Sequence, residues 1–461
     1  MHLVDESDAV PVTSVGDLVD HFRTAEKPRE QWRVGTEHEL IGVRAQGPQA
    51  GTPPAYDGAD GIGAVLAGFA ARGWTPVQER GHVIALSHGA AQVTIEPGGQ
   101  FELAARPVSH SCDLVADLRE HVGTLAEVSL PMGLAWLSIG LRPFGGREDI
   151  PWMPKERYDV MRAYMPTVGT HGLDMMLRTA TVQTNLDWSD EEDAAAKLRC
   201  LMSVTQLLTA LWASSPILDG KVSGYQSYRA HIWRHTDNDR SGLLRFAFED
   251  APVYRAYVEW ALDVPMYFVY RGGYRPVRGL TFRQFMANGW EGEHATRADW
   301  GLHLSTLFPD ARMKKYMEVR GCDCGSLPMI AALAPFCHGL LYDETARAAA
   351  IALTAGLDWD ARQTLADEVP KSGLATRVGK TTVGELSREL VAIARDGLRR
   401  TLPGVLRLIE PVAHIAETGR TQADEIIEMW NANAGNVEAQ VRALAHPGLH
   451  PTTNTTSDLS C

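Results

Sequence analysis

The chain has 461 residues, of which 45% are hydrophobic and 22% charged, and its formal net charge is −13 at pH 7. The acidic balance and the lack of a Lys/Arg-rich block disfavour a nucleic-acid partner. No apolar run reaches the roughly 18–20 residues that a membrane span needs, so we expect no membrane partner either.

The N-terminal stretch MHLVDESDAVPVT carries acidic residues and no apolar segment, unlike a secretory signal or an Arg-rich transit peptide. Six cysteines are too few to indicate a disulfide framework, so we expect reduced thiols and a cytoplasmic protein. The tightest group, Cys322, Cys324, Cys337 and His338, could form a zinc set, but its spacing is unusual for zinc. Small buried thiols are the competing interpretation.

The first half of the chain predicts a mixture of helices and strands. Behind a Ser14 cap, Val15, Leu18, Val19 and Phe22 share one helical face. The remaining predicted elements are a Pro/Gly loop over 45–56, a helix that follows it and ends at Gly73, strands over 82–87 and 91–96, a helix over 111–131, a strand over 132–141, and a helix over 189–213 with an acidic first turn.

The C-terminal third, from about residue 343, is rich in Ala and Leu at helical spacing, which predicts a helix-rich flank. We expect one large catalytic domain over residues 1–445. Residues 446–461 are polar and are predicted to be a disordered tail.

Carboxylates occupy one face of several predicted strands. Since residues at i and i+2 share a face of a strand, Glu37 lies beside Glu39, and Gln100 beside Glu102. Glu96 lies opposite Ile95, on the face away from the core.

Two further strands repeat this arrangement. Glu318 and Arg320 share a face in YMEVRG, and Thr181 and Gln183 share one in TATVQTNLDW. A solvated face of an antiparallel sheet explains any one strand, but four strands together weaken that explanation. Clustered carboxylates repel one another unless a cation intervenes.

Magnesium is the cation that suits such a face, because hard oxygen ligands without His or Cys are typical of Mg²⁺ sites that also hold phosphate groups. The face therefore predicts a platform for ATP and metal. The stretch GLATRVGKTT at Gly373 has one residue too many for a phosphate-binding loop and follows no clear strand, so we reject that alternative.

Several long motifs resemble the plant-type glutamate–cysteine ligases, which occur in plants and many bacteria. They include GTEHE, EPGGQFEL, YRAHIWRHTDNDRSGLL, ALDVPMYFVYR, TFRQFM and YMEVRG, and the likeness runs from about Pro28 to Trp430. The resemblance implies an α+β fold with a curled antiparallel sheet of the glutamine synthetase-like type, helices packed outside it, and a helical C-terminal part. It also implies ATP-dependent formation of γ-glutamylcysteine through a γ-glutamyl phosphate, the first step of glutathione biosynthesis.

Roles for individual residues follow from the resemblance. Arg320 would hold a phosphate group, Arg229 would clamp the glutamate α-carboxylate, and Tyr267 would line the acceptor end. Arg178 is a further candidate whose strand parity the sequence leaves open. Thr181 and Gln183 would line the glutamate site, and the expected Mg²⁺ ligands, for two or more ions, are Glu37, Glu39, Glu96, Glu102, Glu318 and, with less support, Gln100.

The chain departs from the family pattern where RGCDCGS replaces RGADGG, which places Cys322 and Cys324 beside a predicted site strand. This departure leaves a different amine acceptor open as the alternative function. A surface arginine and a core tyrosine remain the alternatives for Arg229 and Tyr267. The sequence does not separate a monomer from a homodimer.

Overall fold

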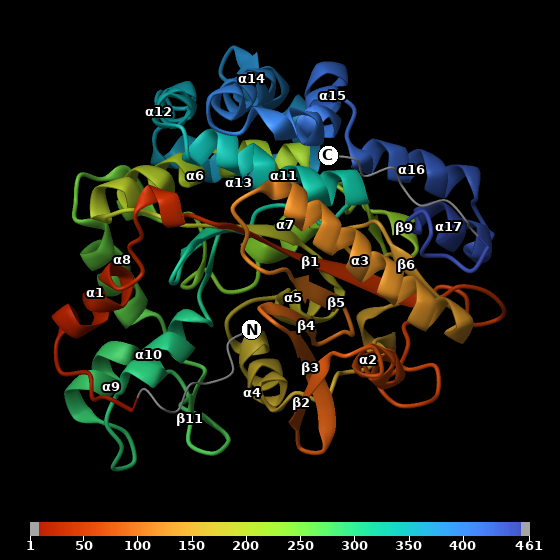
Figure 1. Ribbon diagram of the computed structural model, residues 1–461, viewed down its shortest axis with the longest axis horizontal. Helices are drawn as coiled ribbons and strands as arrows, with labels where there is room; N and C mark the ends of the chain where they lie inside the picture. The colour runs from red at the N-terminus through yellow and green to blue at the C-terminus, as the bar shows by residue number, and fades with distance from the viewer. Residues whose placement is uncertain (1–8, 453–461) are drawn as a thin grey trace.

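A nine-stranded sheet forms the centre of the fold in the computed structural model, which describes residues 9–452 (Figure 1). The strands lie in the order β14-β15-β7-β1-β5-β4-β3-β2, and β6 also pairs with β1. Every pairing in it is antiparallel. Its strands are β1 Val34–Arg44, β2 Thr75–Glu79, β3 His82–His88, β4 Ala91–Ile95, β5 Phe101–Ala104, β6 Leu134–Leu137, β7 Val182–Leu186, β14 Ala311–Met313 and β15 Met317–Val319.

Helices surround this sheet, and short two-stranded pairs lie in the connections: β8 Ile217–Leu218 with β9 Lys221–Val222, β10 Ser241–Gly242 with β13 Phe308–Pro309, β11 Phe268–Tyr270 with β12 Tyr274–Pro276, and β16 Arg377–Val378 with β17 Thr381–Thr382. The helices are α1 Val15–Arg23, α2 Ile62–Ala70, α3 Ser111–Ser129, α4 Glu156–Tyr164, α5 Gly172–Arg178, α6 Glu191–Leu211, α7 Tyr228–Arg234, α8 Val253–Asp263, α9 Phe282–Asn288, α10 Arg297–Leu304, α11 Leu327–Leu341, α12 Glu344–Leu353, α13 Trp359–Ser372, α14 Val383–Thr401, α15 Glu410–Thr418, α16 Gln422–Ala432 and α17 Val437–Leu444.

One face of β1 is covered by helices. Both α3 and α11 contact β1, and α14 packs on α11 in the helical layer at the top of Figure 1. Leu40 and His38 point to this covered face, and His38 meets His121 of α3 edge to face. The opposite face of β1 is therefore the one that carries Glu37 and Glu39.

The turn between β4 and β5 is held against α5. The Glu96 amide donates to the Gln100 carbonyl, and Gly99 has a φ of 80°, which favours glycine. A Cβ on Gly98 would lie 2.1 Å from the Leu177 carbonyl oxygen, so only glycine fits there. The close approach of this turn is to the backbone of α5.

Most predicted elements form close to their expected positions. The helix predicted over 14–26 is α1, with Ser14 as its cap, and the helix over 189–213 is α6. The strand predicted over 132–141 is shorter, because only Leu134–Leu137 pair in β6. Helices from α12 onward form the predicted C-terminal flank.

The predicted tail is wrong in its first part. Residues 446–450 are packed on the domain, where His446, Leu449 and His450 are fully buried. The Trp136 amide donates to the Leu449 carbonyl, which ties this segment to β6. The polar composition missed these long-range contacts, and residues 453–461 lie outside the described part of the chain.

The curl that the resemblance implied for the sheet is not present. Within residues 9–452 the strand neighbours run in one open order, and no pairing joins β14 to β2. The coarser expectation, an α+β fold built on a large antiparallel sheet, is confirmed.

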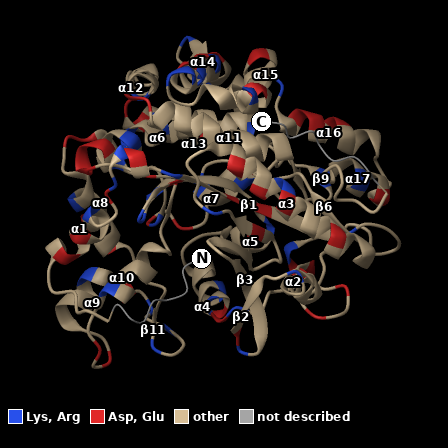
Figure 2. Ribbon diagram, in the orientation of Figure 1, with Lys and Arg blue, Asp and Glu red and all other residues tan. Residues whose placement is uncertain are grey.

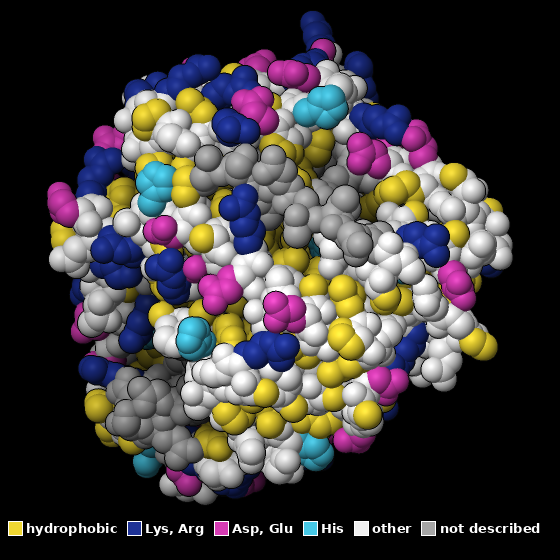
Figure 3. All heavy atoms as spheres, turned by 45° about the vertical axis from the view of Figure 1, so that its right-hand side comes forward, with side chains coloured by type: hydrophobic (Ala, Val, Ile, Leu, Met, Phe, Trp, Pro, Cys, Tyr) yellow, Lys and Arg dark blue, Asp and Glu magenta, His cyan; other side chains and the backbone are white. Residues whose placement is uncertain are grey.

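No helix within residues 9–452 is long and apolar enough to cross a membrane. On the face drawn in Figure 3, Lys and Arg side chains alternate with Asp and Glu. In Figure 2, acidic side chains gather on α3 and α16.

The contact between α11 and α14 depends on two glycines that face each other. A Cβ on Gly397 would lie 1.9 Å from the Gly339 carbonyl oxygen. We predict that Gly397→Ala lowers the free energy of unfolding by about 1–3 kcal/mol, because the helices must move apart. Gly123→Ala is the control, because nothing lies near that Cβ in α3, and it should stabilise the protein slightly. Equal melting temperatures for both variants would contradict this account.

Candidate active site

Side chains from four strands of the sheet, β1, β5, β7 and β14, and from segments that adjoin its strands line a cavity of about 160 Å³ on the uncovered face of the sheet. Helices α4, α5 and α7 supply the opposite walls. Of the predicted site residues, the cavity brings together Glu37, Glu39, Glu96, Gln100, Glu102, Thr181, Gln183, Arg229 and Arg320.

Strand register explains this convergence. Glu39 lies opposite Glu102 across the β1–β5 pair, and Glu37 lies opposite Gln183 across the β1–β7 pair. Because paired residues point to the same face, each pairing brings two polar side chains together. Asn185 donates to Glu37 at 2.8 Å, which fixes that carboxylate.

The carboxylates at the β4–β5 end repel one another. Burial, with Glu102 and Glu96 as like charges, raises the pKa of Glu39 well above its ordinary value. Burial, with Glu96 and Glu37, raises the pKa of Glu102 to about 7. The positive charge of Lys155 and Arg229 nearby therefore does not offset burial and the like charges at this acidic end.

Glu318 is in the opposite situation. Arg312 donates to it twice, at 2.7 and 3.0 Å, and Lys314 and Arg320 lie 3.0 and 2.7 Å from its oxygens. Although burial would raise the pKa of Glu318, these three cations hold it well below its ordinary value. Its fully buried carboxylate does not line the cavity, and its present geometry positions Arg320.

Arg320 joins β15 to β7 at the cavity wall. Its guanidinium donates to Gln183 at 2.8 Å as well as to Glu318. Gln183 is thus held by protein contacts, and the rest of the Arg320 guanidinium faces the cavity.

Arg229 is placed at the start of α7 by a buried carboxylate. Asp323 accepts hydrogen bonds from the Ser214 amide and the Ser215 and Ser227 hydroxyls at 2.6–3.0 Å. Ser215 in turn accepts from the Arg229 amide. The Arg229 side chain lies 3.8 Å from Asp323, too far for a hydrogen bond, and leaves most of its donors for the cavity.

Besides Glu318, three other predicted site residues do not lie as expected. The Gln100 oxygen accepts from the Gly98 amide, and its nitrogen donates to the Met176 and Thr179 carbonyls, so its amide braces the turn. Tyr267 is a core residue under the Arg240 guanidinium, 3.9 Å from its ring centroid, and is absent from the cavity lining. Arg178 points away from the cavity to Asp219 and Asp174.

Thr181 lines the cavity as expected, at the end of β7. Its hydroxyl donates to the Cys322 carbonyl at 2.8 Å, and its amide donates to Glu39 at 3.0 Å. The residue therefore holds the β7 end against both the Cys322 segment and β1.

The cysteines near this segment form no metal site. Cys322, Cys324 and Cys337 are free and buried, and burial raises the pKa of each thiol. The interpretation as small buried thiols fits better than the zinc set.

The sequence interpretation missed several cations that line the cavity or lie beside its carboxylates. Lys155 is 2% exposed and donates to the Ile95 carbonyl, close to Glu96 and Glu102. Arg312 and Lys314 alternate with apolar residues in DARMKKYMEV, and this strand parity was the available signal. Arg157 and Trp233 lie on helices that only the tertiary fold brings to the cavity.

Oxygen donors without His or Cys fit magnesium, and the raised carboxylate pKa values at the acidic end are what a cation would relieve. As the side chains stand, however, no three His, Cys, Asp or Glu residues within 9–452 converge closely enough to hold a metal ion. The carboxylates would have to rotate to share one, so metal binding stays a prediction.

A profile of the glutamate-cysteine ligase family 2 matches residues 33–443. The chain belongs to this family. It is 42% identical over 426 residues to the chloroplastic glutamate–cysteine ligase of Brassica juncea, covering 91% of this chain and 81% of that protein. The Arabidopsis thaliana protein of the same name is 41% identical, with 91% and 80% covered.

A solved structure supports the family fold. The glutamate–cysteine ligase of Francisella tularensis, crystallised with AMP, superposes with a TM-score of 0.53 at 13% identity, covering 90% of this chain and 87% of that one. At this identity the likeness shows a shared fold and carries no residue roles.

The crowding of carboxylates predicts that the negative charge of Glu102 lowers the free energy of unfolding. Since the pKa of Glu102 is raised from 4.5 to about 7, the folded protein binds more protons than the unfolded chain between these values. Stability therefore falls as pH rises through this window. We predict that Glu102→Gln in EDTA raises the free energy of unfolding by about 1–3 kcal/mol at pH 8 and by little at pH 4.5.

Denaturant unfolding at the two pH values measures this effect. Glu120→Gln, at an exposed position of α3, is the control and should change neither value. A Glu102 variant that is less stable than the wild type at pH 8 would contradict the repulsion.

Proposed function

We propose that the chain is an ATP-dependent ligase that joins L-glutamate to L-cysteine, giving γ-glutamylcysteine for glutathione synthesis. The observation that carries the proposal is the family match over residues 33–443, together with a cavity that sets carboxylates beside arginines. The two named relatives are both called glutamate–cysteine ligases. Because both are chloroplastic, the cytoplasmic location stays a prediction.

The cavity is divided by charge in a way that suits this chemistry. Arg229 and Arg320, with Arg312 and Lys314 behind them, make one end cationic, and Glu39, Glu96 and Glu102 make the other acidic. Phosphoryl transfer is catalysed mainly by positioning and by stabilising developing negative charge. The cationic end can hold the γ-carboxylate of glutamate and the transferring phosphate near each other.

Each arginine has a separate proposed role. Arg320 contacts a phosphate group, and Glu318 fixes its orientation through the 2.7 Å ion pair. Arg229 clamps the α-carboxylate of glutamate, a task for which its planar, bidentate donor is suited.

The acidic end is proposed to hold magnesium, two or more ions, through Glu37, Glu39, Glu96 and Glu102. Bound there, Mg²⁺ would neutralise phosphate charge of ATP. Glu318 becomes a ligand only if it releases some of its three cations, and Gln100 only if it leaves the turn that it braces.

An acceptor panel tests the reaction. With Mg-ATP and glutamate present, ADP release should rise with added cysteine and should stay low with alanine, serine or glycine, and mass spectrometry should find γ-glutamylcysteine. ADP release that ignores cysteine and responds to another amine would sink the cysteine assignment. It would leave a γ-glutamyl ligase with a different acceptor.

Arg229→Lys tests the clamp. We predict a rise of about tenfold or more in the glutamate KM, because a point charge replaces a bidentate donor, with little change in the ATP KM. Arg395→Lys is the control, since Arg395 pairs with Glu410 on the helical flank. An unchanged glutamate KM in the Arg229 variant would refute the role.

A further inference from the structure

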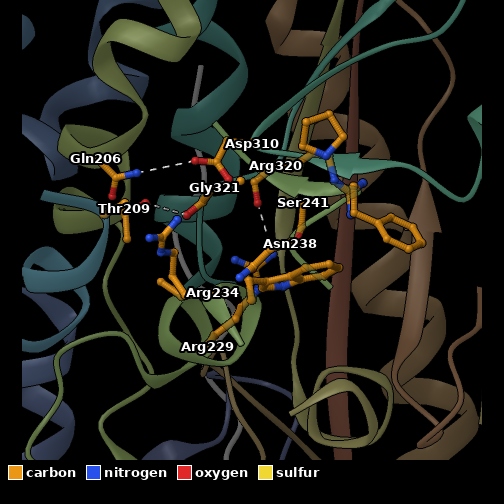
Figure 4. A pocket seen from close by; sticks show the side chains of 15 residues that line it. Gln206, Thr209, Arg229, Arg234, Asn238, Ser241, Asp310, Arg320 and Gly321 are labelled. Carbon is orange, nitrogen blue, oxygen red and sulfur yellow. Dashed lines mark hydrogen bonds between the residues drawn. The ribbon is translucent and has the colours of Figure 1, made fainter. Parts of the chain in front are cut away.

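A second, smaller cavity of about 40 Å³ shares Arg229 with the large one, and Figure 4 shows its lining. Its polar lining includes Arg229, Arg234, Arg320, Asp310, Asn238 and Gln206. None of the roles proposed above uses Asp310 or this space.

The two cavities share a wall of two arginines and two aromatic rings. Arg229, Trp233, Phe308 and Arg320 line both. The Trp233 and Phe308 rings are 5.6 Å apart, and the Arg320 guanidinium lies over both, at 5.7 and 5.5 Å. A ligand bound at this wall can therefore reach into both cavities.

Arg229 has unused donors in this wall. The residue is 3% exposed, and its Nε has no hydrogen-bond partner among the described residues. One terminal nitrogen donates to the Arg320 carbonyl at 3.1 Å, and Asp323 is 3.8 Å away. A buried guanidinium with free donors indicates a missing anionic partner.

Asp310 lacks a close cationic partner among the described residues. Its carboxylate makes no ion pair within 4.0 Å in the described part of the chain, and its two side-chain hydrogen bonds, from Thr205 and Gln206, are long at 3.4 and 3.5 Å. Burial raises the pKa of Asp310 although Arg234, Arg229 and Arg320 oppose it. Arg234 itself is engaged by Asp367 at 2.9 Å. An enclosed carboxylate in this state has room for a cationic donor from a ligand.

The mixture of charges narrows the class of ligand. Three guanidiniums would repel a free metal cation, and the Asp310 carboxylate would repel a simple anion. A zwitterion with an ammonium next to a carboxylate satisfies both sides, and that is the head of an α-amino acid.

We infer that Asp310 accepts the α-ammonium of the glutamate substrate, while Arg229 holds its α-carboxylate and the γ-carboxylate extends past Trp233 into the larger cavity. This inference rests on the proposed function and adds a specificity residue to it. The extended side chain of glutamate brings its γ-carboxylate toward Arg320 and the acidic end, where the proposed phosphoryl transfer takes place.

Asp310→Asn, assayed with glutamate and with glutarate, tests the inference, since glutarate lacks only the amine. Wild-type protein should prefer glutamate strongly in kcat/KM. The variant should raise the glutamate KM about tenfold or more and reduce the preference over glutarate by at least tenfold, with the ATP KM little changed. A residue that only supported the fold would lower both rates together.

Two further variants sharpen the comparison. Asp310→Glu keeps a carboxylate and should retain most of the preference for glutamate. Asp367→Asn also removes a negative charge beside Arg234, but from a side chain that is 57% exposed, and it should leave the preference unchanged.

An active Asp310→Asn protein with an unchanged preference for glutamate over glutarate would overturn the inference. An effect confined to the cysteine KM would also overturn it, because Asp310 would then bind the amino-acid head of cysteine, the acceptor. Wild-type protein without glutamate-dependent ADP release would instead reject the proposed function. If the variant does not fold, a crystal structure of the wild type with glutamate decides. An ammonium bound to Asp310 supports the inference, and one bound elsewhere overturns it.

Discussion

The repulsion among Glu39, Glu96 and Glu102 on one face of the sheet is the constraint on which the site depends. Antiparallel register sets Glu39 directly opposite Glu102, and the β4–β5 turn adds Glu96. The fold tolerates this charge because the opposite face of β1 is packed against α3 and α11. Stability is thus reduced at the place where the proposed cation would bind.

Glu318, on the same sheet, is a carboxylate that stays charged. Three cations surround it, and one of them, Arg320, reaches the cavity wall. The contrast divides the cavity into a cationic end, where the one carboxylate is fully compensated, and an acidic end, where nearby cations compensate the carboxylates only in part. Phosphate groups suit the first and metal ions the second, which is how one cavity could bring ATP and a carboxylate substrate together.

The alternation of side chains along single strands could be read from the sequence. It placed Glu37, Glu39, Glu102 and Gln183 on one face, because strand parity is a local property. Tyr267 and Arg178 lay beyond its reach, because their surroundings are set by packing between distant segments. Gln100 has the predicted parity, but its amide is used by the turn, which no strand pattern reveals.

The cations in and around the cavity show the same limit of strand parity. Arg312 and Lys314 have the parity of a site strand and could have been found, whereas Arg157 reaches the cavity only because α4 packs there. Residues 446–452 were predicted to be disordered from their polar composition, yet their histidines fill space beside β6. Composition describes what a segment contains and not what lies next to it.

Anomalous diffraction from crystals grown with Mn²⁺ and a non-hydrolysable ATP analogue tests the central claim most directly. Mn²⁺ replaces Mg²⁺ at oxygen sites and can be located by its scattering. The account predicts a peak coordinated by carboxylates among Glu37, Glu39, Glu96 and Glu102, with the analogue's phosphates on the same ion. A nucleotide bound in the cavity without metal at these carboxylates, or a metal held elsewhere, would contradict it.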